Sequence, residues 1–436
     1  MNNFWEKLKT ILRDATLRKR LGFTILALVV FRLLATIPIP GINQANLAAL
    51  FSSNQLFGVI NVFSGSGLSN LSIVMLGVGP FITATIIIQL LTMIFPKWKN
   101  LMHEEGEAGR MKLSQYSRYL SVPLAIISAI GFLILLQSSA VLPHLSTFAF
   151  TINVIVVATG SMLLMWIGEL ISEFGIGNGV SLIIFAGIVA RLPSAIFQNY
   201  AQIATGGANN ISFYVIVLIV AIMATAGVVY VTEAERSVPV TYAKQVRGNK
   251  VYGGASTYLP LRLNQSGVIP IIFALSILLF PQLIFKALST WTSHPAFANF
   301  GLTLSNLFAN PWFYGIFYFL LVVLFTYFYT AVTFDPKMIS ENLQRSGAFI
   351  PGVRPGEHTE GYLGNIVTRI TLVGALFLGF VAILPLIIQA FSPQGITSVT
   401  GSGGSITIGG TALLIVVSVV LDLLKKVDAQ VAMREY

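Results

Sequence analysis

The chain has 436 residues, of which 55% are hydrophobic and 10% are charged, and its formal net charge is +10. Soluble domains carry about 25% charged residues, so this composition predicts a membrane protein with several spanning helices. The absence of cysteine excludes a disulfide framework, a thiol nucleophile and a thiolate metal site. The four histidines are scattered without metal-ligand spacing, so we expect no metal and no other cofactor.

The first twenty residues, 1–20, are charged and predict a cytoplasmic amphipathic helix rather than a cleavable signal. Apolar segments follow, each near the ~20 residues that a bilayer requires except the fifth, which is shorter. They lie near residues 21–40, 73–95, 119–139, 152–172, 180–193, 212–232, 267–287, 312–333, 366–390 and 407–424. The sequence therefore predicts an all-α polytopic membrane protein with ten transmembrane helices and a polar cytoplasmic tail at 425–436.

An unusual polar stretch precedes the second apolar segment. Asn61–Ser72 is free of charge and rich in Gly, Ser and Asn, and the apolar run after it, from Ile73, is interrupted by two glycines and Pro80. Irregular polar backbone exists at membrane depth only where protein buries it or where it lines a water-filled cavity. Two interpretations stay open: an extracytoplasmic loop leading into a helix, or a short half-helix folded into the mouth of a pore.

Lysine and arginine orient the predicted bundle. Nearly all of the 26 basic residues fall before the first segment, in alternate loops after it, and in the tail, whereas the opposite loops are almost uncharged. The positive-inside rule then places both termini in the cytoplasm. The acidic residues fall on the same side, so the positive charge describes a cytoplasmic face and not a nucleic-acid-binding domain.

Arg32 is the one charge well inside a predicted span. A central Arg costs about 2.5–3.5 kcal/mol on insertion scales, so its side chain should face protein or water. It is interpreted either as a structural residue that bonds neighbouring helices or as a residue that faces a pore.

The two largest cytoplasmic loops have ordered patterns. Val238–Gln265 alternates β-branched and aromatic residues around Arg247 and Lys250, which predicts a hairpin with a basic tip. Asn342–Gly364 sets Arg354 between two Pro-Gly turns, which should hold its side chain out from a stiff loop. Either loop could simply set topology, but long ordered loops are uncommon without a function, and a docking surface is expected.

Motifs of soluble enzymes are absent. Gly175–Gly179 lacks the G-x-G-x-x-G spacing and lies between two apolar segments, so it predicts a turn and a helix cap. The chain has no G-x-x-x-x-G-K-[ST] motif, so any nucleotide hydrolysis must come from a partner. We expect no catalytic residue in this chain.

Several short motifs occur in an order that resembles the SecY family, the channel subunits of the bacterial protein-export translocon. The resemblance runs from about Arg20 to Leu424. The motifs that carry it are Phe31–Gly41, Asn61–Leu91, Gly175–Gly179, Gly267–Pro270, Gly347–Gly356 and Gly409–Thr411.

The resemblance implies two pseudo-symmetric halves of five helices each around an hourglass pore, hinged between the fifth and sixth spans. The first half would comprise residues 21–195, the extracytoplasmic hinge 196–211 and the second half 212–424. Cytoplasmic loops at 233–265 and 334–365 would extend the second half.

The resemblance also implies a plug that closes the outer funnel and an aliphatic ring at the constriction. The plug would be Asn61, Val62, Phe63, Ser64, Gly65, Ser66, Gly67, Leu68, Ser69, Asn70, Leu71 and Ser72. The ring would be Val78, Ile82, Val180, Ile184, Ile272 and Ile415. Branched apolar side chains exclude water and ions by dewetting and can part around an extended peptide without binding it tightly. The two valines imply a slightly wider or softer collar than one richer in isoleucine.

Two further regions follow from the resemblance. The seam through which hydrophobic segments leave for lipid, between spans 2–3 and 7–8, would include Thr83, Ser128, Asn264 and Phe280. The docking site for the ribosome and the motor ATPase SecA would include Arg247, Lys250, Arg345 and Arg354. The chain departs from the family in having Asn249-Lys250 where adjacent arginines are expected, which leaves open how Arg247 and Lys250 share the docking role.

The implied partners are the small membrane subunits SecE and SecG, SecA, the ribosome with its nascent chain, signal peptides, unfolded polypeptides and membrane lipids. The cytoplasmic loops could also contact ribosomal RNA, and the implied location is the bacterial plasma membrane.

Three other functions are alternatives to a passive protein-conducting channel. A secondary transporter shares repeats and broken helices but needs a compact midplane site with ionisable groups, for which only Arg32 is a candidate. An insertase-like or structural scaffold would not need the aliphatic ring, and an intramembrane enzyme would need a paired catalytic constellation that the chain lacks.

Overall fold

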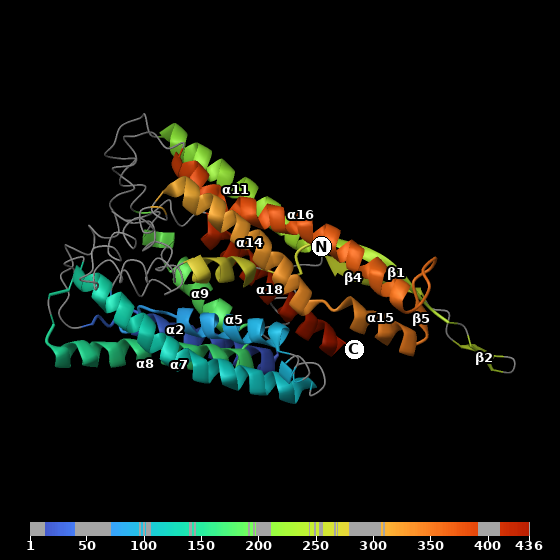
Figure 1. Ribbon diagram of the computed structural model, residues 1–436, viewed down its shortest axis with the longest axis horizontal. Helices are drawn as coiled ribbons and strands as arrows, with labels where there is room; N and C mark the ends of the chain where they lie inside the picture. The colour runs from blue at the N-terminus through green and yellow to red at the C-terminus, as the bar shows by residue number, and fades with distance from the viewer. Residues whose placement is uncertain are drawn as a thin grey trace.

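The structure, a computed structural model, is dominated by long helices that lie side by side in two groups (Figure 1). It describes residues 14–39, 71–95, 106–138, 145–190, 211–243, 245–247, 250–252, 256–265, 269–278, 310–390 and 410–435, with a few isolated residues between them. In Figure 1, α7 and α8 lie in the lower group and α11, α14 and α16 in the upper group, with α9 and α18 between the two.

Every predicted apolar segment coincides with a helix in the described part of the chain. In the first half these are α2 (Ala15–Leu34), α5 (Gly79–Ile94), α7 (Gly106–Ser138), α8 (Thr147–Phe174) and α9 (Gly179–Val189). In the second half they are α11 (Ile211–Glu233), a short helix at Ile269–Leu278, α14 (Pro311–Thr333), α16 (Glu357–Ala390) and α18 (Gly410–Glu435).

Length and composition separate these helices into classes. Within the described residues, five helices are long and apolar enough to cross a membrane, and they are α7, α8, α11, α14 and α16. The apolar helices α5, α9 and Ile269–Leu278 are shorter, whereas α2 and α18 combine an apolar stretch with charged residues.

Several helix boundaries differ from the sequence-based ones; α7, for example, begins at Gly106 rather than near residue 119. The first span begins at Ala15 rather than near residue 21, because the Asp14 carboxylate accepts the Thr16 N–H (2.9 Å) and caps α2 there. Residues 15–20 of the predicted separate N-terminal helix therefore belong to α2, and residues 1–13 lie outside the described residues.

The second span begins at Gly79 rather than near residue 73. Residues 71–78 form turns, Gly77 takes a positive φ of 59°, and Pro80 occupies the first turn of α5, where its missing N–H costs nothing. At the other end of the chain, the predicted tail is helical to Glu435. There Lys425 Nζ pairs with Glu233 of α11 (2.8 Å) and Lys426 Nζ with Asp422 (2.9 Å).

The two large loops between α11 and α16 form one structural unit. Strand β1 (Glu235–Tyr242) pairs antiparallel with β4 (Ser256–Arg262) and, on its other edge, with β5 (Ala348–Phe349), so that the sheet order is β4-β1-β5. Strands β2 (Gln245–Arg247) and β3 (Lys250–Tyr252) form a hairpin that projects beyond this sheet (Figure 1). Helix α15 (Pro336–Arg345) completes what we call the sheet unit.

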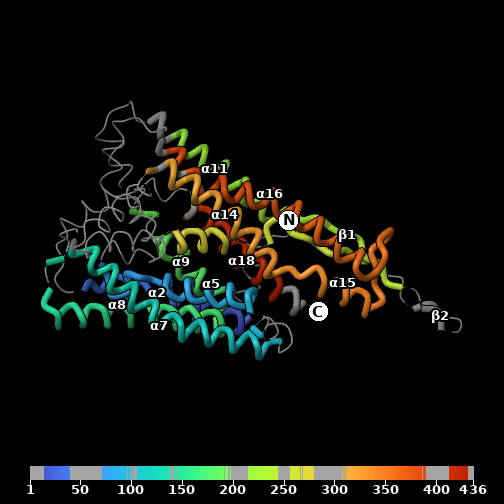
Figure 2. Tube along the Cα trace, viewed as in Figure 1, coloured from blue at the N-terminus to red at the C-terminus, as the bar shows by residue number. Residues whose placement is uncertain are grey.

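The sheet unit has its own apolar cluster, which joins β1, β4 and β5 to the first turns of α16. Its buried members are Val238, Val240, Leu261, Ala348, Ile350, Leu363, Ile366, Val367 and Ile370. The Cα trace shows the unit at one end of the molecule, continuous with the lower end of α16 (Figure 2). Because α16 also contributes to the helical core, it continues from the sheet unit into the bundle, and α11 and α14 lead directly into β1 and α15.

Candidate functional site

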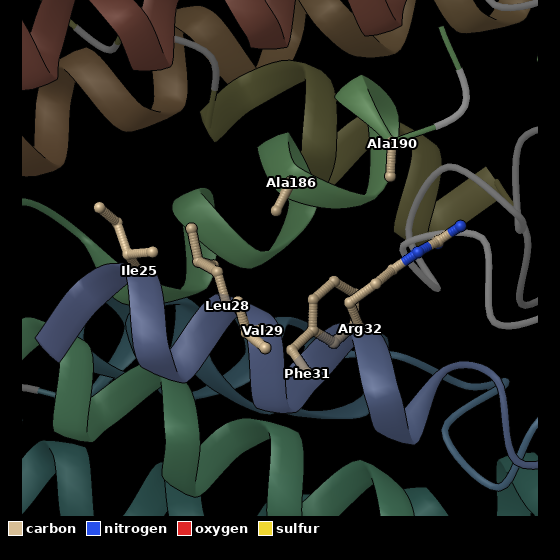
Figure 3. A pocket seen from close by; sticks show the side chains of 7 residues that line it. All are labelled: Ile25, Leu28, Val29, Phe31, Arg32, Ala186 and Ala190. Atoms are coloured by element: carbon tan, nitrogen blue, oxygen red, sulfur yellow. The ribbon is translucent and has the colours of Figure 1, made fainter. Parts of the chain in front are cut away.

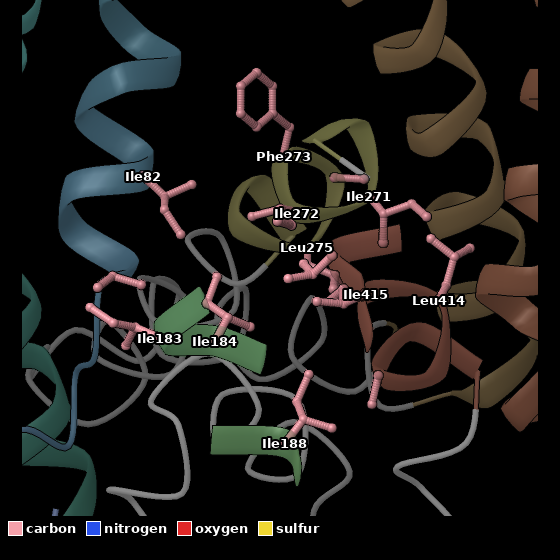
Figure 4. Close-up of a cluster of buried hydrophobic side chains, with 14 of the residues drawn as sticks. Ile82, Ile183, Ile184, Ile188, Ile271, Ile272, Phe273, Leu275, Leu414 and Ile415 are labelled. Carbon is pink, nitrogen blue, oxygen red and sulfur yellow. The ribbon is translucent and has the colours of Figure 1, made fainter. Parts of the chain in front are cut away.

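The predicted ring residues converge in one hydrophobic cluster. Val78, Ile82, Ile184, Ile272 and Ile415 are buried members of this cluster, and Val180 packs against it while partly exposed. Figure 4 shows Ile82, Ile184, Ile272 and Ile415 directed toward one another from four different helices. The arrangement brings together side chains separated by more than three hundred residues, and it is apolar throughout.

Local structure explains how the first half presents its ring residues. Val78 is the N-cap of α5, and its carbonyl oxygen accepts the Ile82 N–H (3.0 Å), so both side chains share one helix face. Val180 and Ile184 have the same spacing at the start of α9, whose N-cap Asn178 accepts the Ser181 N–H through its side chain (3.2 Å).

The second half presents Ile272 and Ile415 through packing of larger side chains. Ile272 lies on the short helix 269–278, where Phe273 meets Phe325 and Tyr329 of α14 edge-to-face, with ring centroids 6.1 and 6.0 Å apart. Ile415 lies on α18 and is fully buried.

Sequence reasoning missed other aliphatic residues of the same cluster. Figure 4 places them beside the ring residues: Ile183, Ile188, Ile271, Leu275 and Leu414. The helical stretches that carry them, 179–189, 269–278 and 410–421, contain no charged residue, so their sequences have no polar face that could tell a constriction-facing side chain from one that faces a neighbouring helix.

Only the end of the predicted plug is described, since residues 61–70 lie outside the described residues. Leu71 and Ser72 are buried and form a short antiparallel bridge with the chain after α2. The Ile39 N–H donates to the Leu71 carbonyl oxygen (2.9 Å), and the Ile73 N–H donates to the Ile37 carbonyl oxygen (3.0 Å). The segment therefore ends at a fixed point, where Leu71 takes a positive φ of 41° that is uncommon for a residue with a side chain.

The predicted seam residues lie on three elements, and Phe280 lies outside the described residues. Thr83 is buried in α5 and donates to the Gly79 carbonyl oxygen (3.1 Å), whereas Ser128 is half-buried in α7. Asn264 is buried before the short helix, and its Nδ2 donates to the Gly267 carbonyl oxygen (3.2 Å). These hydrogen bonds of Thr83 and Asn264 stabilise their own segments, so neither bond links two seam elements.

The predicted docking residues all belong to the sheet unit. Arg247 and Lys250 are register partners at the described end of the β2–β3 hairpin, which confirms the predicted hairpin. Arg345 ends α15, where its guanidinium is 3.5 Å from the Glu341 carboxylate. Arg354 is exposed on the loop between α15 and α16.

The Arg354 loop is held from both sides. The glycines of its two Pro-Gly pairs, Gly352 and Gly356, take positive φ values of 84° and 96°, which glycine adopts readily in tight turns. The buried Thr359 hydroxyl donates to the Arg354 carbonyl oxygen (2.8 Å), and Ser340 Oγ of α15 donates to the Gly356 carbonyl oxygen (2.7 Å). The backbone of Arg354 is therefore fixed while its cation extends into solvent.

Arg32 lines an open cavity of about 230 Å³ between α2 and α9 (Figure 3). The other lining residues are apolar: Ile25, Leu28, Val29, Phe31, Ala186 and Ala190. The Arg32 Nη1 atom is buried without a hydrogen-bond partner in the part of the chain that the structure describes. That nitrogen therefore makes no bond to a neighbouring helix among the described residues, and the cavity it borders is distinct from the meeting point of the ring side chains.

No group of three or more potential metal ligands occurs among the described residues. The arrangement thus combines a buried apolar cluster within the helices with a sheet unit at one end that carries exposed Arg354.

Comparison with known proteins gives one consistent result. Residues 72–424 match the family model described as SecY. The chain is similar to the protein translocase subunit SecY of Thermotoga maritima, with 40% identity over 444 residues, covering 99% of this chain and 97% of that protein.

Solved structures show a matching fold. A structure reported as that of a protein conducting channel matches 96% of this chain and 93% of its own, with a TM-score of 0.65 and 19% identity. Sec61 in a canine ribosome-channel complex from the endoplasmic reticulum also matches 96% of this chain and 93% of its own, with a TM-score of 0.63 and 18% identity.

Proposed function

Because the chain belongs to the SecY family and is a protein-conducting translocation channel, we propose that its ring residues form the constriction through which unfolded secretory polypeptides cross the membrane. The chain is a multi-pass membrane protein, and it is a channel subunit and not an enzyme. The observation that carries the proposal is the convergence of aliphatic side chains from α5, α9, the short helix 269–278 and α18 in one buried cluster.

The physical argument rests on what such a collar does to water. Branched aliphatic side chains give water no hydrogen-bond partners, so a narrow collar of them dewets and resists ions when closed. The same side chains offer an extended peptide only weak, non-directional contacts, which allows it to slide. The proposed ring must therefore exclude water and ions when it is closed and must let a peptide slide when it is open. Its residues are apolar and come from both halves of the chain, which supports both functions.

The plug and the seam are proposed on the same basis. Asn61–Ser72 would close the outer side of the constriction, and the anchoring of Leu71 and Ser72 beside the end of α2 supports a plug attached at a fixed point. Deleting residues 64–71 should therefore raise the resting ion conductance in planar bilayers. A deletion channel that stays ion-tight at rest would contradict the plug.

The seam is the proposed exit to lipid. Hydrophobic segments would leave sideways past Thr83, Ser128, Asn264 and Phe280.

The sheet unit would dock cytoplasmic partners. The exposure of Arg354 on a loop whose backbone is hydrogen-bonded on both sides supports this role, because a guanidinium held in place loses little entropy on binding carboxylate, phosphate or carbonyl groups. The partners would be a SecA-type motor and the ribosome, including its RNA, and SecE- and SecG-type subunits would complete the complex. One similar structure is described as a ribosome-channel complex, which agrees with this assignment.

The proposed location is a bacterial plasma membrane, with both termini of the chain in the cytoplasm.

The proposal is tested by crosslinking an arrested secretory chain to single cysteines, for which the cysteine-free sequence provides a clean background. Cysteines at Ile184 and Ile415 should crosslink to the polypeptide in transit. When a hydrophobic segment is arrested instead, cysteines at Thr83 and Ser128 should also react. The control is Ile219→Cys on the exposed face of α11. Equal crosslinking at Ile219 and at the ring positions would contradict the assignment of the conduit.

A further inference from the structure

Helix α8 contacts the backbone immediately before both ring segments of the first half. At one contact, Gly160 packs so closely against Ile73 that a methyl group added there would overlap the Ile73 carbonyl oxygen. Its neighbour Ser161, fully buried, donates from Oγ to the Gly77 carbonyl oxygen (2.8 Å). Gly77 directly precedes Val78, so this hydrogen bond fixes the backbone from which the first ring pair begins.

The second contact fixes the start of α9. A methyl group on Gly179 would overlap the Gly168 carbonyl oxygen, so the two backbones touch at this point. The Ser172 hydroxyl donates to the Gly168 carbonyl oxygen (3.0 Å) and accepts the Gly179 N–H (2.9 Å). Gly179 directly precedes Val180, so the second ring pair also begins from backbone held against α8.

Gly168 is also adjacent to a ring side chain itself. A methyl group at this position would lie 3.2 Å from Val180 Cγ2 and 3.4 Å from Ile183 Cδ1, so these side chains would have to shift by a few tenths of an ångström. Ser161 and Gly168 are seven residues apart, about 10 Å along the axis and nearly on one face of α8. One rigid helix therefore sets the separation between the two ring pairs of the first half.

We propose that α8 positions the first-half side of the constriction, with Ser161 and Gly168 as positioning residues that set how tightly the ring closes. The inference rests on the proposed function of the ring. Neither residue is itself part of the ring: Ser161 acts through the Gly77 carbonyl, and Gly168 acts through the space it leaves for Val180. Removing the Ser161 hydrogen bond or adding a methyl group at Gly168 should displace a ring pair. The resting channel should then become more permeable to ions.

The test compares Ser161→Ala and Gly168→Ala with two matched controls on α7. Ser117→Ala removes a buried hydroxyl whose bond is to the Leu113 carbonyl of its own helix (3.1 Å), and Gly131→Ala adds a methyl group with no atom within 4 Å. The resting ionic conductance of each purified channel is measured in planar bilayers. Ser161→Ala should raise it about fivefold, as expected when one buried hydrogen bond is lost, and Gly168→Ala should raise it as well. Both controls should match the parent.

A local readout separates positioning from general loss of structure. In an Ile184→Cys background, a membrane-impermeant thiol reagent should label the ring position faster when Ser161→Ala or Gly168→Ala is present, while the thermal unfolding temperature stays near that of the controls. Should Gly168→Ala fail to fold, Ser161→Ala decides alone, since it removes a single oxygen atom. Unchanged conductance and labelling in folded Ser161→Ala would overturn the inference.

An Ile415→Asn channel distinguishes this failure from failure of the constriction itself. If Ile415→Asn conducts ions while both α8 variants behave as their controls, the assignment of the constriction is supported and the positioning role of α8 is wrong. If Ile415→Asn is as tight as the parent, the proposed constriction is wrong and the α8 inference falls with it.

Discussion

The proposed constriction and the sheet unit are built in opposite ways from the same chain. The proposed constriction uses many aliphatic side chains, drawn from four helices and buried together, and none of these side chains can make a hydrogen bond. The sheet unit instead presents an exposed cation, Arg354, on backbone that is hydrogen-bonded at defined positions, and its β2–β3 strands pair in a defined register.

This difference indicates where each region is vulnerable. A collective apolar seal tolerates a change of one aliphatic residue for another, but a polar group within it alters the hydration of the whole constriction. A proposed docking cation would act through a directed contact, so its identity and the rigidity of its loop should both matter. A change in one region should therefore leave the other region intact.

The largest effect is expected from Arg354. Arg354→Glu should abolish motor-driven translocation in proteoliposomes, and Arg354→Lys should lower its rate on the order of tenfold, because the ammonium group cannot reproduce the planar donor set of a guanidinium. Resting conductance should equal that of the parent. The control is Arg110→Glu, which removes an exposed cation from α7, on the same side by the positive-inside rule. If Arg354→Lys translocates at the parent rate, the docking role is wrong.

The next effect concerns the constriction. Ile415→Asn places an unpartnered amide in a dewetted collar, which costs about 1–3 kcal/mol and favours a hydrated pore, so resting conductance should rise about tenfold. Export of substrates with defective signal sequences should rise with it, while docking of the motor stays normal. Ile184→Asn is the matched variant, since both side chains are fully buried. Its effect should be smaller because α9 is fixed against α8. An Ile184→Asn channel that leaks more than Ile415→Asn would contradict this ranking.

The smallest effect tests the rigidity of the Arg354 loop. Thr359→Val keeps the shape of a buried side chain but removes the hydroxyl that donates to the Arg354 carbonyl oxygen. Losing this bond should cost about 1 kcal/mol and weaken motor binding about fivefold with Arg354 itself unchanged. Thr368→Val is the control, because its hydroxyl bonds to the Gly364 carbonyl within α16. Equal motor affinity in the two variants would show that the loop does not need this support.

Local features of this protein followed from the sequence alone. Apolar runs of spanning length predicted the helices, because a lipid environment admits spanning segments only when their backbone bonds are internal. The alternating residues around Arg247 and Lys250 predicted the hairpin, and the Pro-Gly pairs beside Arg354 predicted turns, whose glycines take positive φ in the structure. Each of these depends on interactions between residues close together in the chain.

Features that depend on distant contacts were decided only by the tertiary structure. The sequence presents the loops at 233–265 and 334–365 as separate, yet β1 pairs with β5 and joins their cations into one unit. Ring membership was implied by resemblance and not by periodicity, because the apolar helices have no polar face to orient them. The contacts of α8 with Gly77 and Gly179 were likewise hidden. A glycine or serine in an apolar run gives no sign of whether another backbone lies against it, and only the packing of α8 against α5 and α9 supplies that partner.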